Sequence, residues 1–107
     1  MASDYKNAKV DLTTTDATVL YTAPAAKSAV FKSILVSEDT GSADTITVTL
    51  TDAAAAVFSL FKVKAVAANT TIELLEQPLV VETGEIIKFT AATANRLHVV
   101  ASFMEIS

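Results

Sequence analysis

The feature that most constrains the fold of this chain is a strict alternation of threonine with large aliphatic residues between residues 45 and 51. Ile46, Val48 and Leu50 fall on one side of this segment, and four threonines fall on the other. A period of two residues is that of a half-buried β-strand, and β-branched side chains suit its pleated surface. The segment is therefore predicted to be a strand with one face against a core and the other facing water.

Similar segments follow one another along the chain, separated by short turn-forming stretches. Pro24 ends the first, because proline has no amide hydrogen for a β-ladder. Thr83-Gly84-Glu85 is predicted to be a tight hairpin turn with Gly84 at positive φ. The predicted strands are residues 17–22, 28–37, 45–51, 57–66, 70–75, 79–81, 85–91 and 96–106. We therefore expect a single all-β domain, an antiparallel β-sandwich of seven or eight strands with jelly-roll or immunoglobulin-like topology.

The segment from Asp52 to Asn69 allows two interpretations. It holds seven alanines, and alanine is the best helix former. The alternation of Lys62 and Lys64 around Val63 instead favours a strand in the second half. We favour the strand over 57–66, with at most a short helical turn at residues 53–56.

Residues 1–12 differ in composition from the rest of the chain. They carry Asp4, Lys6, Lys9 and Asp11 but few large apolar side chains, although 51% of the whole chain is hydrophobic. Such a segment fits either a frayed terminus or an arm that becomes ordered on a neighbouring molecule. We therefore divide the chain into an N-terminal arm, residues 1–12, and a β-sandwich domain, residues 13–107.

The residue types that catalysis and nucleic-acid binding require are scarce. The chain has no cysteine, two glycines and a single histidine, His98, so we expect no nucleophilic triad, zinc site or phosphate-binding loop. Its net charge of −4 and its dispersed basic residues do not suit a phosphate backbone. No apolar run is long enough to span a bilayer, and the first residues lack a secretory signal pattern. We expect no enzyme activity, no cofactor, and neither nucleic acid nor membrane as a partner.

The acidic residues of the loops leave two alternatives open. Glu38, Asp39, Asp44 and Asp52 could supply oxygen ligands for calcium, although their spacing matches no EF-hand loop. Paired carboxylates could also hydrolyse a glycosidic bond, but the chain has no tryptophan and only two tyrosines to hold a sugar. Solvated surface loops are the simpler explanation, so we predict no metal site.

Three predicted strands, 28–37, 57–66 and 96–106, carry apolar residues on both faces. In the first of them, for example, Phe31 and Leu35 alternate out of phase with Ile34. Exposed apolar patches mark interfaces, whereas a β-bulge would reverse the facing within a strand and remove the surplus. Bulges could account for one or two of these strands, but we favour an interface over bulges as the explanation for all three. The candidate contacts are Lys9, Val10, Phe31, Leu35, Phe61, Val63, Val100, Met104 and Ile106.

Four stretches of the chain resemble small structural proteins of tailed bacteriophages. The run from Val19 to Val30 is similar to a YTAPAGKTA-like turn in those proteins, and Phe31 to Val36 is similar to the strand that follows it. Further similarity lies in Ser42 to Val48 and in Pro78 to Glu85, so the resemblance covers roughly residues 17 to 105. Alanine stands at position 26, where these proteins usually have glycine.

The resemblance implies a virion component made in the host cytoplasm, with the major capsid protein or another virion protein as partner. We expect a capsid decoration (cement) protein that stabilises the head, arranged as a small symmetric homo-oligomer such as a trimer. The alternative is a tail, fibre or head-fibre module involved in host attachment. A small hydrolase is the least favoured class.

Overall fold

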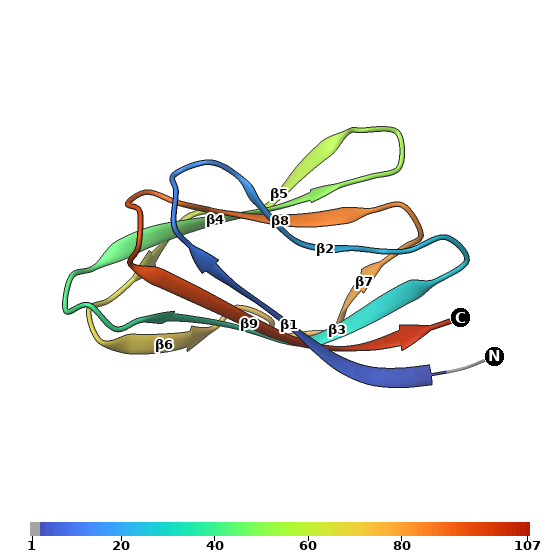
Figure 1. The fold of residues 1–107 in the computed structure, drawn as a ribbon, viewed down its shortest axis with the longest axis horizontal. Helices are drawn as coiled ribbons and strands as arrows, with labels where there is room; N and C mark the ends of the chain where they lie inside the picture. Colours follow the sequence, from blue (N-terminus) through green and yellow to red (C-terminus); the bar gives the residue numbers. More distant parts are fainter. Residues whose placement is uncertain (1–2) are drawn as a thin grey trace.

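The computed structural model describes residues 3–107, which form two antiparallel β-sheets packed face to face (Figure 1). The strands of this part of the chain are β1 (Ser3–Leu12), β2 (Thr18–Thr22), β3 (Ser28–Glu38), β4 (Asp44–Thr51), β5 (Val57–Val66), β6 (Thr70–Glu73), β7 (Leu79–Val81), β8 (Ile86–Ala91) and β9 (Leu97–Ile106). The prediction of an all-β antiparallel sandwich is confirmed. The strands number nine rather than seven or eight, because the first residues also form one.

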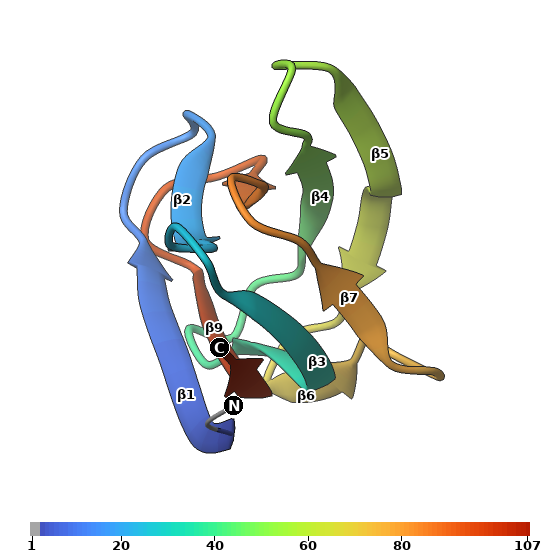
Figure 2. The same cartoon turned by 90° about the vertical axis from the view of Figure 1, so that its right-hand side faces the viewer.

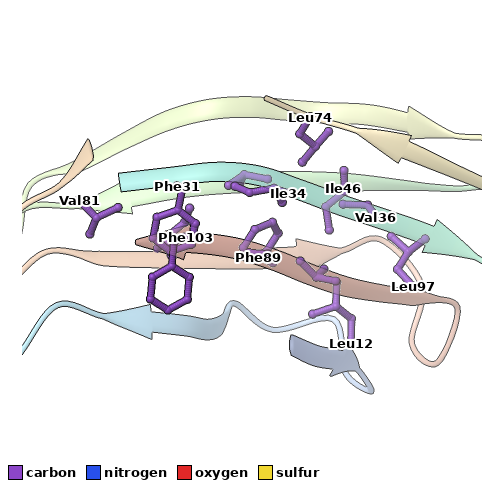
Figure 3. Close-up of a cluster of buried hydrophobic side chains, with 14 of the residues drawn as sticks. Leu12, Phe31, Ile34, Val36, Ile46, Leu74, Val81, Phe89, Leu97 and Phe103 are labelled. Atoms are coloured by element: carbon purple, nitrogen blue, oxygen red, sulfur yellow. The ribbon is translucent and has the colours of Figure 1, made fainter. Parts of the chain in front are cut away.

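The larger sheet has the order β1-β9-β3-β6, and β7 pairs with the other half of β3. The smaller sheet has the order β2-β8-β4-β5. Figure 2 shows that β1 and β5 stand on opposite sides of the molecule. Apolar side chains from both sheets fill the space between the layers (Figure 3). Among the largest of them are Phe31, Ile34, Ile46, Phe89 and Leu97, each at most 1% exposed.

The segment predicted to be an N-terminal arm is, from residue 3 onward, an edge strand of the larger sheet. It pairs with β9 over its whole length, from Ser3 opposite Ile106 to Leu12 opposite Leu97. Leu12 is buried, and Ala8 and Val10 pack against the core beside it. The alternation of these small and medium side chains was too weak a sequence signal to show a strand. The first two residues of the predicted arm lie outside the described residues.

A β-bulge between Phe31 and Ser33 explains the two-faced pattern of β3. Phe31 lies opposite Phe103, and after the register shift Ile34 lies opposite Ala101, so that both Phe31 and Ile34 point inward. The bulge that we considered as an alternative is therefore present in this strand. The prediction that Phe31 faces outward was wrong.

The carboxylate of Glu73 holds the bulge. It accepts hydrogen bonds from the amide of Ile34 (2.7 Å), from the amide of Leu75 (3.2 Å) and from the hydroxyl of Ser33. Burial alone raises the pKa of this carboxyl, but these three donors outweigh it and lower the pKa. Glu73 thus joins β3 to the end of β6 where the regular ladder is interrupted.

Two turns contain residues with a left-handed backbone conformation, and only one of these was predicted from the sequence. Gly84 has φ +82°, as predicted, and the amide of Glu85 donates to the carbonyl of Glu82 (2.9 Å). The turn is not a hairpin, however, because β7 pairs with β3 whereas β8 pairs with β2 and β4. Ala26 has φ +62°, the left-handed region that favours glycine.

The alanine-rich segment contains a strand and a turn. The predicted strand at 57–66 is confirmed as β5, and residues 53–56 form a turn and no helix. Asp52 organises this turn, since its carboxylate accepts hydrogen bonds from the amides of Ala54 and Ala56, each at 2.9 Å. A side chain that satisfies nearby amides in this way stabilises a turn against a helix.

Candidate interaction surfaces

The outer face of the larger sheet carries a group of apolar side chains with no covering layer in the described chain. Alternate residues of β9 point to this face, since Leu97, Val99, Ala101 and Phe103 point into the core. The residues of β1, β3 and β7 that pair with these β9 residues, directly or through β3, lie on the same outer face. We call this surface the apolar face; it consists of Tyr5, Val30, Leu35, Val80, Val100, Met104 and Ile106.

These residues lie in rows that cross the strands. One row runs across four strands as Tyr5, Met104, Val30 and Val80. A second places Val100 beside Leu35. Four of these side chains are well exposed, with fractions of 80% for Tyr5, 52% for Val80, 40% for Val100 and 39% for Leu35. Together these rows form a contiguous group of apolar side chains on the outer face of the larger sheet.

The sequence-predicted contacts divide into two groups. The structure brings Leu35, Val100, Met104 and Ile106 together on the apolar face, and Lys9 lies at its edge opposite Val100. Tyr5, Val30 and Val80 belong to the same surface but were missed, because only the pairing of distant strands places them there. Alternation with apolar neighbours was the signal available in the sequence for Val30 and Val80, whereas Tyr5 lies between the exposed Asp4 and Lys6 and had no such signal.

The remaining predicted contacts lie elsewhere. Phe31 is fully buried and stacks on Phe103, with 4.7 Å between the ring centroids. Val10 is partly buried and packs against the core, so it does not lie on the apolar face. Phe61 also packs against the core, whereas Val63 is 60% exposed on β5.

The first part of β5 is a second exposed apolar surface. Val57 and Phe58 are 63% and 53% exposed, although both residues pair with the end of β4. The sequence predicted Phe61 to be an outward contact, but it packs against the core while Phe58 is exposed. Register shifts between β4 and β5 at Val48 change the facing along the strand, which is why the assignment reversed.

His98 lies beside the apolar face, between two carboxylates. Its Nδ1 is 2.5 Å from Asp11 Oδ1, and its Nε2 is 3.3 Å from Asp39 Oδ1. The hydrogen bond to Asp11 is the main cause that raises the pKa of His98, and partial burial opposes it. The cluster connects the end of β1 to the loop that follows β3.

The row Asp11, His98 and Ser37 contains the residue types of a nucleophilic triad. The second ring nitrogen of His98 contacts the carboxylate of Asp39, which has no hydroxyl proton to give up. A triad requires that nitrogen to accept the proton of the attacking hydroxyl. The contacts of His98 are therefore those of a charge cluster that joins three segments.

A buried carboxylate, Glu105, lies at the end of the larger sheet opposite His98. Glu105, 5% exposed, accepts hydrogen bonds from Lys6 Nζ (2.8 Å), Tyr21 Oη (2.6 Å) and Lys27 Nζ (3.5 Å). The Lys6 and Tyr21 hydrogen bonds hold the pKa of Glu105 at about 2. Burial, together with the bond to Glu105, raises the pKa of Tyr21. This cluster fixes the exposed half of β1 to β9.

The loop acids that we considered for calcium are dispersed. Glu38, only 1% exposed, accepts amide hydrogen bonds from Thr40, Gly41, Ser42 and Asn69. Burial raises its pKa, but these bonds and one from the Thr40 hydroxyl outweigh that effect and bring the pKa to about 2.

The other loop acids have separate roles. Asp44 accepts the amide of Thr93 (3.1 Å), and Asp52 organises the β4–β5 turn. Within residues 3–107, no three His, Cys, Asp or Glu side chains are grouped so that they could hold a metal ion. No helix in the same part of the chain is long and apolar enough to cross a membrane.

No protein-family model matches this chain, and no curated protein matches it.

Proposed function

We propose that this chain is a structural component of a bacteriophage virion, a capsid decoration protein that binds the major capsid protein through its apolar face. The observation that carries the proposal is the uncovered group of Leu35, Val80 and Val100 on the outside of the larger sheet. Burial of apolar surface contributes about 25 cal/mol per Å². A modest contact repeated over a capsid would therefore stabilise the shell considerably.

Further features support a binding role over a catalytic one. The three carboxylates with a lowered pKa, Glu38, Glu73 and Glu105, bind amides, hydroxyls or lysines of the same chain. They fix loops, a bulge and a strand, which produces a rigid platform under the apolar face. A preformed surface binds with a smaller loss of conformational entropy. The resemblance of residues 17–105 to small phage structural proteins supports the virion as the setting.

We infer further that the sandwich is a jelly roll rather than an immunoglobulin-like domain. Along the chain, β1, β3, β6 and β9 belong to one sheet and β2, β4, β5 and β8 to the other. Two four-stranded sheets whose successive strands mostly alternate between layers are typical of a jelly roll, with the short β7 as an addition. The jelly roll is common among viral coat proteins.

The first test of this proposal is the copy number in purified particles of the phage that encodes the chain. Quantitative mass spectrometry against the major capsid protein is expected to give hundreds of copies. A handful of copies per particle contradicts decoration of the capsid and favours the alternative, a tail, fibre or head-fibre module.

A second experiment maps the binding surface with two matched valines. Val80 lies on the apolar face and is 52% exposed; Val19 lies on the outer face of the smaller sheet and is 48% exposed. Val80→Glu is expected to abolish co-sedimentation with heads that lack the protein, whereas Val19→Glu binds as the wild type does. Equal binding by both variants contradicts the assignment of the face.

A further inference from the structure

The smaller sheet ends in a long edge strand whose outer edge pairs with no other strand of residues 3–107. β5 is ten residues long and pairs only with β4. The other outer strands are protected from further pairing. β1 carries Asp4, Lys6, Lys9 and Asp11, whereas β2, β6 and β7 have only three to five residues each. An exposed edge of this length is a template for pairing with another strand.

The two halves of β5 differ in how they can pair. The second half carries Lys62 and Lys64 and bends at Val63, whose φ is +53°. Charges and irregular backbone of this kind discourage pairing. The first half, residues 57–61, has no charged residue. Its two adjacent side chains Val57 and Phe58 are both more than half exposed.

The hydrogen-bond pattern of the β4–β5 turn shows which main-chain groups are free. The amide of Asp52 donates to the carbonyl of Ala56 (2.9 Å), and the pairing is regular from there to Ser59. Bonded and non-bonded pairs alternate in an antiparallel ladder. The amide and carbonyl of Phe58 therefore point to β4, and those of Val57 and Ser59 point away from it.

We propose that two copies of this chain associate by antiparallel pairing of β5 with β5, about a twofold axis that passes beside Phe58. Val57 of one copy then exchanges main-chain hydrogen bonds with Ser59 of the second copy, and the two Phe58 side chains face each other as a non-bonded cross-strand pair. A twofold contact requires a self-complementary surface. In this register the two Phe58 rings also contact each other across the twofold axis.

Charge also favours a second copy as the occupant. Antiparallel pairing centred on Phe58 carries Lys62 and Lys64 of one copy past the β4–β5 turn of the other. Asp52 is the only charged residue of that turn, so opposite charges approach at both ends of the contact. The result is a continuous eight-stranded sheet that leaves the apolar face free. This association is independent of the partner proposed for that face.

The oligomeric state tests the inference directly. Light scattering coupled to gel filtration is expected to give a mass of twice the 11.2 kDa chain. Phe58→Glu removes the aromatic pair and places like charges opposite each other, so it is expected to weaken association by about 10-fold or more, with an unchanged circular dichroism spectrum. A wild-type monomer, a trimer, or a Phe58→Glu variant that dimerises as tightly as the wild type each overturns the proposal.

A cross-link tests the register and does not depend on that variant. The chain has no cysteine, and cross-strand Cβ atoms of a non-bonded pair are near disulfide distance. Phe58→Cys is therefore expected to form a covalent dimer rapidly under mild oxidation. Val19→Cys, on an equally exposed site of the same sheet, is expected to remain monomeric on a denaturing gel. Equal cross-linking of both variants, or of neither, contradicts a twofold axis at Phe58.

Discussion

At the scale of single residues, His98 connects three segments through charge. Asp11 and Asp39 face its two ring nitrogens from β1 and from the loop after β3, and both carboxylates are largely exposed. Because its pKa is raised in the folded state, His98 stabilises the fold when protonated. That contribution is complete below the ordinary pKa of 6.5 and disappears as the pH rises through the folded-state pKa.

We predict that an NMR titration of His98 gives a pKa above 6.5, and that Asp11→Asn lowers it towards this value. The measurement is unambiguous because the chain has one histidine. Asp16→Asn, on the exposed loop after β1, serves as the control and is expected to leave the titration unchanged. A wild-type pKa at or below 6.5 would contradict the geometry of the cluster.

Glu105 gives the opposite dependence on pH. Its pKa of about 2 in the folded state lies below the ordinary 4.5, so it stabilises the fold above pH 4.5. This stability is lost as the pH falls from 4.5 towards 2. Lys6 and Lys27 are 47% and 39% exposed, and solvent screening therefore reduces their share of the stabilisation.

Glu105→Gln is expected to lower the free energy of unfolding at neutral pH by about 1–3 kcal/mol, at the low end of this range because of that screening. The difference between wild type and variant should shrink as the pH falls from 4.5 to 2 in urea titrations. A difference that stays constant over this interval shows that the Glu105 charge does not stabilise the fold.

At the scale of elements, the bulge in β3 depends on a carboxylate from another strand. Glu73→Ala leaves the amide of the fully buried Ile34 without its acceptor, which is expected to cost about 1–3 kcal/mol of stability. Hydrogen exchange at the amides of Ile34 and Leu75 should accelerate in this variant. Glu76→Ala, three residues away and exposed, should leave both unchanged. If both variants behave alike, Glu73 does not hold the bulge.

Strands were predictable where one face is apolar and the other polar. The alternation from Thr45 to Thr51 shows directly which residues of the strand face the core. The bounds of β4 agree with the predicted strand to within one residue. β1 was missed because Ala8, Val10 and Leu12 form too small an apolar face to stand out in the sequence. The bulge in β3 was open to either interpretation, since its cause, Glu73, lies 40 residues away from Ser33 along the chain.

The candidate surface was also predictable only in part, because residues distant in the sequence contribute to it. The residues of β9 that face outward follow from alternation alone, and Val100, Met104 and Ile106 lie on the apolar face as predicted. Their neighbours Tyr5 and Val80 come from β1 and β7, and only the pairing of the strands brings them together. Local periodicity does not specify which strands are neighbours.

At the scale of the whole molecule, the two exposed apolar surfaces lie on different sheets. The apolar face covers the outside of the larger sheet, and the first half of β5 lies at the edge of the smaller one. A pair of copies joined through β5 therefore still presents two apolar faces. Under the proposed function, such a pair would bind two neighbouring subunits of the shell.

The most direct test of the central claim is a cryo-electron microscopy map of the intact particle. We predict density for this chain in many copies on the capsid surface, with Leu35, Val80 and Val100 against the major capsid protein. A map in which the chain occurs only in the tail, or in which these three side chains face solvent, would contradict the account.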